Sequence, residues 1–176
     1  ISLGLVGSEM CIRDRITIKE ITDKAGVIRP TFYNHFQDKY ELIEWIIKSE
    51  LLEPIKPLLN AGMIFEAIVL MLNNISANSV FYKKALKLEG AVTFNQIAMK
   101  CVYEMFMNII NEKSTGKKSK YRWLTPEVIS TYYAQSLCFI TEGWIAQGMD
   151  DIEPKEMAEA YMYLITRSMD DILSEL

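Results

Sequence analysis

The stretch of chain from Ile16 to Leu42 constrains the fold more than any other part of the sequence. Thr17 has the side chain of a helix N-cap, and Glu20 follows at the spacing of a capping box. Gly26 is expected to end this helix, because glycine adopts the left-handed C-cap conformation without a steric penalty. Pro30 stands where a second helix would begin, since its fixed φ suits the first helical turn. The pattern predicts two short helices joined by a tight turn.

Apolar residues in this stretch are spaced to hold the two helices together. Most of them recur at helical spacing on one face of their helix. The residues expected to face inward are Ile18, Ile21, Ala25, Val27, Phe32 and Phe36. Asp38 is expected to cap a third helix that runs to about residue 53, where Pro54 and Pro57 would stop it.

A helix, a glycine turn and a second short helix rich in donors form the plan of a helix-turn-helix, whose second helix lies in the DNA major groove. The specific fragments are AGV at 25–27, TFY at 31–33, HF at 35–36, Lys39, and Glu41-Leu42. At this spacing they resemble the DNA-binding signature of TetR-type transcriptional regulators. The resemblance implies an all-α fold, with an N-terminal helix-turn-helix DNA-binding domain and a helical C-terminal domain for ligand binding and dimerisation.

The candidate DNA contacts follow from the resemblance and from side-chain chemistry. Tyr33 and Lys39 match family positions that touch DNA phosphates. Arg29 is expected either to pair with guanine or to form a salt bridge with Asp23. Asn34 is expected to face the groove. The full candidate set is Thr17, Arg29, Pro30, Thr31, Tyr33, Asn34, His35 and Lys39.

Three members of this set have alternative roles. Thr31 would touch a thymine methyl group or a phosphate. His35 would donate to a phosphate or cap the core of its own domain. Thr17 would contact a phosphate through its hydroxyl and the N-terminus of its helix.

The first fifteen residues, ISLGLVGSEMCIRDR, do not resemble the amphipathic helix with which TetR-type domains begin. Gly4 and Gly7 would each cost about 1 kcal/mol inside a helix. We interpret residues 1–15 as a foreign leader, similar to a translated cloning adapter, that replaces a native first helix; the alternative is a native, poorly ordered terminus. We expect residues 16–53 to hold the DNA-binding region and linker helix, and residues 54–176 the effector-binding and dimerisation domain.

Charge and composition limit the class of protein. The net charge is −4, which argues against a protein that coats nucleic acid. Residues 17–39 contain four basic and three acidic residues, so the net charge of this stretch is only +1. This is a weak positive charge for a DNA-binding surface. No run reaches the ~18 apolar residues of a membrane span. The three cysteines show no disulfide or metal spacing, so we expect a cytoplasmic protein with no membrane partner.

No catalytic pattern is present in the sequence. His35 is the sole histidine, and we find no HExxH motif, glycine-rich phosphate loop or metal-ligand cluster. We therefore expect no enzyme activity, no cofactor and no metal site.

The remaining chain predicts further helices over 64–78, 79–90, 94–111, 126–148 and 154–173. Residues 112–122, between the third and fourth of these helices, contain five lysine and arginine residues. We interpret this segment as a solvated connection and not as a nucleic-acid-binding patch. The resemblance implies that the last two helices pair with those of a second subunit, which a palindromic operator requires.

An effector cavity in the body is also implied by the resemblance. The candidate lining is Met99, Tyr103, Phe106, Tyr133, Cys138, Glu142, Trp144 and Tyr163. Methionine and aromatic residues at helical spacing more often pack in a hydrophobic core than line a ligand cavity. Glu142 could orient a cationic or hydroxylated ligand, or lie on the surface with Gln135.

The body further resembles a subgroup of TetR-type proteins that includes regulators of dihydroxyacetone kinase operons. The matching fragments are Phe81-Tyr82, Gly143-Trp144-Ile145 and Gly148-Met149. Two functions follow for testing. The first is a dimeric repressor on a palindromic operator, released by a small ligand. The alternative is a helical interaction protein: an activator with a protein co-ligand, or a truncated regulator that dimerises without binding DNA.

Overall fold

The computed structural model describes residues 17–88, 90, 92–113 and 119–175, and these form helices with no strand. The helices are α2 (Ile18–Ala25), α3 (Arg29–Tyr33), α4 (Lys39–Ile46), the π-helical segment η1 (Ile47–Leu52), α5 (Glu53–Asn60), α6 (Ile64–Ala77), α7 (Ser79–Ala85), α8 (Phe94–Lys113), α9 (Pro126–Ala146), α10 (Pro154–Thr166) and α11 (Met169–Glu175). The predicted all-α class is confirmed. The interpretation of residues 1–15 lies outside the described residues.

Local sequence signals explain where the N-terminal helices begin and end. Thr17 Oγ1 accepts a hydrogen bond from the Glu20 amide at 3.2 Å, and the Glu20 carboxylate accepts one from the Thr17 amide at 2.7 Å. Gly26 ends α2 with a φ of 67°. Asp38 caps α4 by accepting hydrogen bonds from two amides of its first turn. The predicted capping box, glycine stop and aspartate cap are all confirmed.

The predicted stop at Pro54 and Pro57 is wrong. Pro54 lies in the first turn of α5, where a missing N–H is tolerated, and Pro57 lies inside the same helix. The chain thus remains helical from α4 through η1 to Asn60. It turns at Gly62, whose φ is 79°. Its amide and that of Met63 donate to carbonyls of the last turn of α5, as in a Schellman motif.

The C-terminal prediction also needs correction. A single helix was expected over 154–173, but α10 ends at Thr166 and Arg167 is extended. Ser168 and Asp171 then form a new capping box, in which the Ser168 hydroxyl accepts from the Asp171 amide at 3.2 Å. The S-x-x-D pattern that starts α11 was present in the sequence. Likewise the helix expected over 79–90 ends at Ala85.

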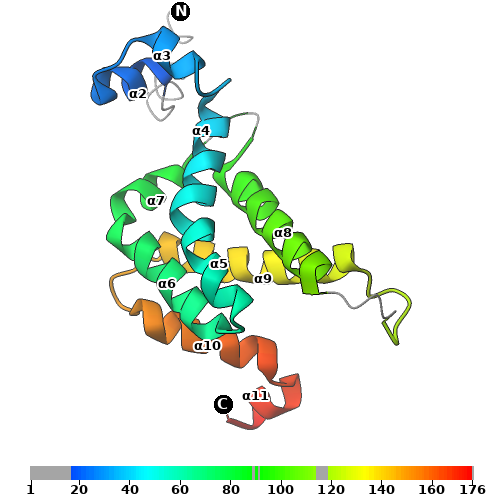
Figure 1. Cartoon of the computed structure of the whole chain (residues 1–176). Helices are drawn as coiled ribbons and strands as arrows, with labels where there is room; N and C mark the ends of the chain where they lie inside the picture. The colour runs from blue at the N-terminus through cyan, green and yellow to red at the C-terminus, as the bar shows by residue number, and fades with distance from the viewer. Residues whose placement is uncertain (1–16, 89, 91, 114–118, 176) are drawn as a thin grey trace, which may run out of the picture.

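The hydrophobic core lies mostly in η1 and in the body (α5 to α10), below the N-terminal head formed by α2 and α3 (Figure 1). α8 packs along α9, and α6 packs on both α5 and α10. Trp144 on α9 is buried, and its indole N–H donates to the Ile152 carbonyl at 2.9 Å. The Tyr161 and Ser136 hydroxyls lie 3.1 Å apart and join α10 to α9. Among the described helices, none alone is long and apolar enough to cross a bilayer. Only α6 and α7 taken together reach the necessary length and hydropathy, and they are bent by 87° at the break between them.

The head meets the body through α4 and η1.

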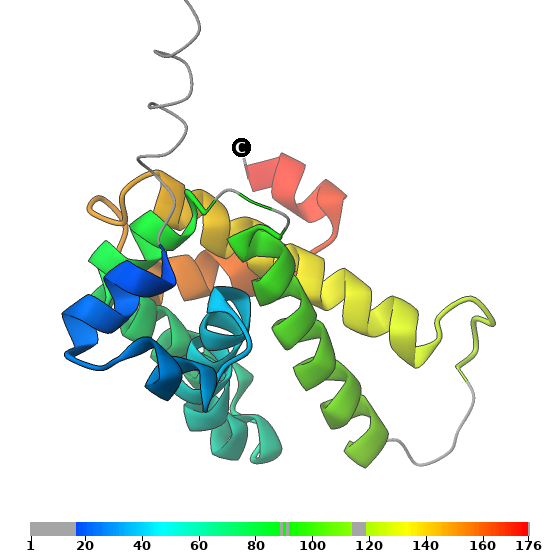
Figure 2. The same cartoon turned by 90° about the horizontal axis from the view of Figure 1, so that it is seen from above.

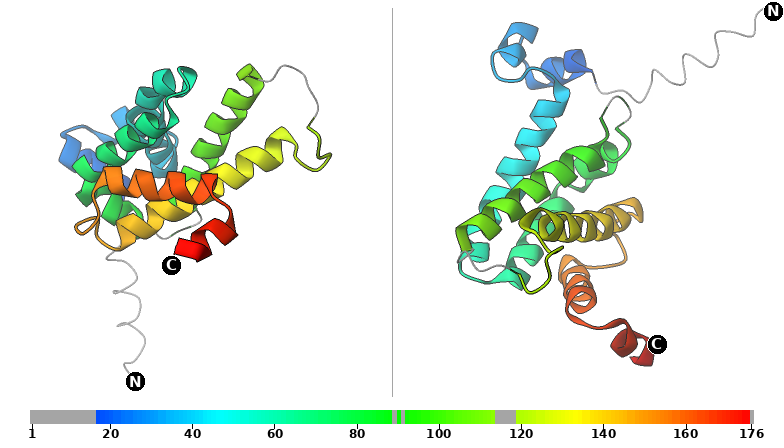
Figure 3. Two further views of the ribbon diagram at one scale, coloured as in Figure 1. Left: turned by 90° about the horizontal axis from the view of Figure 1, so that it is seen from below. Right: turned by 90° about the vertical axis from the view of Figure 1, so that its right-hand side faces the viewer.

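The helices of the body spread apart at its edges. Seen from above, α8 and α9 diverge from each other toward the segment that connects them (Figure 2). Figure 3 shows α11 projecting beyond the end of α10. The loop before α8 also approaches the first turn of α4, because a Cβ added at Gly90 would overlap the Tyr40 hydroxyl.

Four charged side chains connect the linker to α8, and we call them the charge clamp. Lys48 Nζ lies 2.7 Å from Glu44 Oε1 and 2.8 Å from Glu104 Oε2. Lys100 Nζ lies 2.8 Å from Glu44 Oε2 and 3.9 Å from Glu104 Oε1. Each lysine therefore joins a carboxylate of α4 to a carboxylate of α8.

The charge clamp favours the charged form of its members. Hydrogen bonds from Lys100 and then Lys48 lower the pKa of Glu44. Hydrogen bonds to Glu104 and Glu44 raise the pKa of Lys48, and the bond to Glu44 raises that of Lys100. The contribution of Glu44 to stability is present above its ordinary pKa and is lost as the pH falls through the lowered value. The lysine contributions are present below their ordinary pKa and are lost only as the pH rises through the raised values.

We predict that Glu44→Gln lowers the free energy of unfolding by about 1 kcal/mol at neutral pH, since partly exposed ion pairs contribute ~0.2–1 kcal/mol each. The difference from the unmodified protein should shrink as the pH falls below the usual range of a glutamate, roughly 4.3. Urea denaturation at several pH values and one protein concentration measures it. Glu159→Gln, which removes an exposed pair with Lys155, is the control with little effect. A pH-independent difference for Glu44→Gln would contradict the role of the clamp.

Candidate nucleic-acid interface

The core of the head is built on Phe32 and Thr22, both of which are buried. The Thr22 hydroxyl donates to the Ile18 carbonyl one turn earlier at 3.0 Å, so this polar side chain is satisfied while facing inward. Ala25 was expected to face inward but is exposed, and Val27 is 41% exposed. The inward face of α2 is therefore rotated toward Thr22, a position that hydrophobic periodicity alone does not select.

Aromatic contacts connect α3 to α4. The Phe32 and Phe36 ring centroids lie 5.6 Å apart, which agrees with the predicted inward pair. Phe36 also meets the edge of Trp45 on α4, with centroids 6.0 Å apart. These contacts fix the direction in which α3 presents its other side chains.

Seven of the eight candidate DNA contacts lie on α3, in the turn after it and at the first residue of α4. Arg29 and Tyr33 on α3 and Asn34 at its C-cap are exposed. Asp23, which could have paired with Arg29, instead lies 3.4 Å from Lys19 Nζ. The exposed set also includes Pro30 and His35, while Thr31 and Lys39 are partly buried. The structure therefore brings these seven residues together at the outer end of the molecule.

Thr17 lies at the start of α2, where its hydroxyl and amide both donate to the Glu20 carboxylate, at 2.8 and 2.7 Å. The Thr17 amide, and then its hydroxyl, lower the pKa of Glu20. An anionic group thus already occupies this helix N-terminus. A phosphate contact from Thr17 would require its hydroxyl to turn away from Glu20. Lys39 Nζ lies 5.3 Å from the centroid of the Tyr40 ring.

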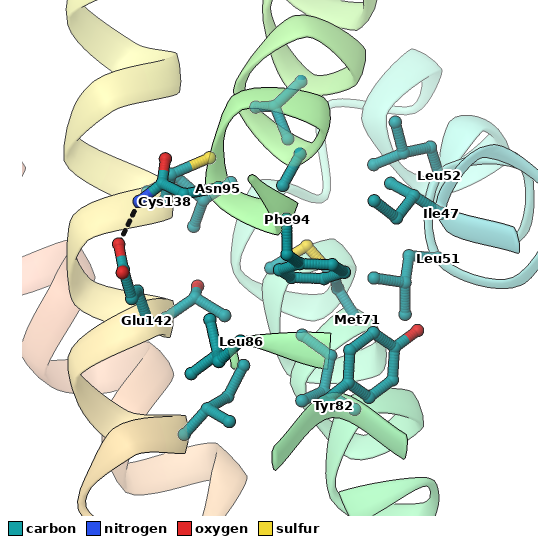
Figure 4. A pocket seen from close by; sticks show the side chains of 16 residues that line it. Ile47, Leu51, Leu52, Met71, Tyr82, Leu86, Phe94, Asn95, Cys138 and Glu142 are labelled. Atoms are coloured by element: carbon teal, nitrogen blue, oxygen red, sulfur yellow. Dashed lines mark hydrogen bonds between the residues drawn. The ribbon is translucent and has the colours of Figure 1, made fainter. Parts of the chain in front are cut away.

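A cavity of about 50 Å³ lies in the body beside the linker. It is lined by η1 and by residues of α6, α7, α8 and α9 (Figure 4). Its polar side is formed by Asn95, Thr141 and Glu142, and the Asn95 amide donates to the Glu142 carboxylate. The Thr141 hydroxyl is buried and has no hydrogen-bond partner among the residues that the structure describes. The remaining walls are apolar, with Leu51 from η1 among them.

Of the expected effector residues, Cys138 and Glu142 line this cavity. Trp144 is buried in the core, and Tyr163 donates to Glu175 at 2.5 Å on α11. The other four are half-buried and do not line the cavity: Met99, Tyr103, Phe106 and Tyr133. Sequence reasoning missed the lining residues from η1, α6 and α7, because an apolar residue facing a cavity has the same helical spacing as one facing the core.

Two cysteines of the body, Cys101 and Cys138, have perturbed thiols, and Cys138 lines the cavity. Burial raises the pKa of Cys138 to about 12 and that of Cys101 to about 11, so both thiols remain protonated at neutral pH. In the described part of the chain, no group of three or more histidine, cysteine, aspartate or glutamate side chains could hold a metal ion.

Comparisons with known proteins agree with this architecture. Residues 14–46 match the family described as bacterial regulatory proteins, tetR family, and residues 63–167 match a transcriptional regulator C-terminal region of the TetR class. The HTH-type dhaKLM operon transcriptional activator DhaS of Lactococcus lactis subsp. lactis (strain IL1403) is 28% identical over 136 residues, which are 76% of this chain and 71% of that protein.

A solved structure is similar in fold. It is the dihydroxyacetone kinase operon activator DhaS, with a TM-score of 0.57 and 23% identity, covering 85% of this chain and 82% of that chain. The two family matches together span most of the described residues. The chain is therefore a member of the TetR family of transcriptional regulators, with a helix-turn-helix domain at its N-terminal end and a helical domain after it.

Proposed function

We propose that this protein binds a palindromic operator as a dimer and regulates transcription there. The observation that carries the proposal is the exposed set of donors on α3, which the buried Phe32 and the Phe36–Trp45 contact hold at the outer end of α4. In a helix-turn-helix, this second helix enters the major groove. TetR-family proteins bind DNA operators as dimers, and we extend that behaviour to this chain. We also propose the division into a head and linker, 16–53, and a body, 54–176.

Within this proposal, the candidate contacts on α3, at its C-cap and at the start of α4 divide into two roles. Arg29 reads a guanine through O6 and N7, because Asp23 is already paired with Lys19. Asn34 faces the groove beside it. Tyr33 and Lys39 bind phosphates, which position the head without reading sequence.

The proposed dimer interface lies on α9 and α10. Tyr132, Phe139 and Ala146 recur every seven residues along α9 and are exposed, which places them on one face. Leu164 on α10 is also exposed. Burying such a stripe against a second copy would remove apolar surface from water and would supply the two-fold axis that a palindrome requires.

We further propose that a small effector binds in the cavity and acts through η1. A volume of about 50 Å³ is well below the ~150 Å³ of an engineered apolar cavity that binds benzene. An effector of ordinary size would therefore have to enlarge the cavity. Because Ile47, Leu51 and Leu52 line it, enlargement would move η1 and the head attached to it.

The sign of regulation has two candidates. Family members typically repress, and release by an effector in the cavity is the first candidate. The names of the DhaS relatives, both activators, favour activation, with a protein co-ligand as the alternative effector. A reporter gene driven from the selected operator separates them: added protein lowers expression for a repressor and raises it for an activator.

For DNA binding, we predict that Lys39→Gln weakens binding to all duplexes about equally and reduces the salt slope by about 1, because it removes one phosphate contact. Arg29→Ala should instead relax base choice at one position of each half-site, with a cost of about 1–3 kcal/mol there. Selection from a random duplex pool, followed by titration at several salt concentrations, measures both effects.

Lys56→Gln is the matched control, because Lys56 is an exposed lysine of α5 that pairs with Glu53 in the body. It should change neither affinity nor salt slope. If Arg29→Ala weakened every sequence equally, its base-reading role would be rejected. If the folded, dimeric protein selected no sequence at all, operator binding itself would be rejected.

For the dimer, we predict that Phe139→Glu shifts the protein toward monomers and weakens operator binding, because a carboxylate would have to lose its water at the interface. Sedimentation velocity and operator titration measure the two effects. Val80→Glu, on an exposed apolar residue of α7, should leave the protein dimeric. A Phe139→Glu protein as dimeric as the unmodified one would place the interface elsewhere.

A further inference from the structure

No residue of α11 is buried. Met169 is 69% and Leu173 61% exposed, and they stand four residues apart on one face. Asp170, Asp171 and Glu175 give the helix a charge of −3, with no basic residue within it. α11 is therefore an acidic helix whose apolar side chains lie in water.

Local contacts organise α11 without packing it. The Ser168–Asp171 capping box starts the helix, and the Tyr163 hydroxyl donates to Glu175 at 2.5 Å. Helices shorter than about 12 residues are marginal in water unless their apolar face packs against something. The exposed face of α11 thus lacks the packing that usually stabilises so short a helix.

A second exposed surface, residues 120–124 between α8 and α9, has the opposite charge. Trp123 is 74% exposed, and Tyr121 and Leu124 are also exposed. Lys120 and Arg122 alternate with them and give the segment a charge of +2. Its backbone is already turned, because the Leu124 amide donates to the Tyr121 carbonyl at 3.0 Å. This segment is a preformed basic and aromatic surface.

We propose that α11 of one subunit docks on residues 120–124 of its partner in the dimer. The two surfaces are complementary, since each combines exposed apolar side chains with a charge opposite to that of the other. Within one subunit they stand apart, as Figures 1 and 2 both show. The proposal rests on the proposed dimer, and it adds to it a reciprocal contact that closes under two-fold symmetry.

A second copy fits this surface better than a foreign partner for two reasons. Each copy carries both halves of the contact, so a closed dimer leaves neither half exposed. Segment 120–124 is also followed at once by α9, which begins at Pro126 and carries the proposed dimer stripe with Tyr132 and Phe139. The docking surface is therefore continuous with that interface.

The test mixes two variants of altered charge. The loop variant carries Lys120→Glu and Arg122→Glu, and the helix variant carries Asp170→Lys and Ser174→Lys, which leaves Asp171 to cap α11. In a loop-variant homodimer, acidic α11 meets an acidic loop. In the heterodimer, the acidic α11 of the loop variant meets the unaltered basic loop of the helix variant. The α11 of the helix variant, whose net charge is 0, meets the acidic loop without net repulsion. We expect roughly tenfold weaker homodimers for the loop variant, and heterodimers well above the statistical proportion in native mass spectrometry.

A control pair places Lys56→Glu and Lys155→Glu, both exposed lysines of the body, against the same helix variant. It should give the statistical proportion. If the loop variant and the helix variant also formed heterodimers only in the statistical proportion, with all proteins dimeric, the docking of α11 on the partner subunit would be rejected. Both surfaces would then belong to a contact within one subunit or to a foreign partner. An unmodified protein that is monomeric would overturn the proposed dimer itself, which is a distinct result. Circular dichroism checks that each variant is folded.

Discussion

The burial of η1 against the body is the constraint on which the position of the N-terminal helix-turn-helix head depends. Ile47 is 1% exposed, and Leu51 and Leu52 are also buried, so this segment cannot rotate without opening the core. α4 continues directly from η1, and the Phe36–Trp45 contact connects α3 to α4. Burial of these apolar side chains stabilises the contact between the linker and the body, and the charge clamp adds ion pairs between the linker and α8.

The negative net charge of the molecule limits any nonspecific attraction for DNA. The chain as a whole is acidic, with a net charge of −4, and α11 adds to the acidity of the body. Nonspecific affinity rises with the number of phosphates neutralised. In the proposed operator complex, a head with few cations would obtain its affinity from direct contacts and from two heads acting together. In that proposed complex the acidic body would be repelled by the duplex, and α3 with its neighbours would approach it.

The sequence predicted the parts of the fold that are encoded locally. The capping box at Thr17, the glycine at Gly26 and the aspartate at Asp38 each specify a helix end through their own backbone hydrogen bonds. The donors of α3 were equally recognisable, because their spacing resembles a family signature. Whether they contact DNA stays a prediction, and so does the role of the cavity.

Tertiary packing decided what the sequence could not show. Nothing local distinguishes Thr22 from a surface threonine or Leu51 from an ordinary core leucine. Two prolines suggested a break that the structure does not have, because Pro54 fits a first turn and the body holds α5 in place. The end of α10 at Thr166 was encoded by Ser168 and Asp171, a signal masked by the apolar pattern that continues across it.

The π-helical turn of η1 has an implication for how related regulators diverge. A π-helical turn closes its hydrogen bonds one residue further along the chain than an α-helical turn, so deleting a single residue there would restore α-helical pairing. Each residue of a helix corresponds to about 100° of rotation around its axis. One deletion or insertion in the linker could then turn the reading head relative to the two-fold axis. Descendants of one protein could in this way come to prefer half-sites of different spacing while both folded units keep their sequences.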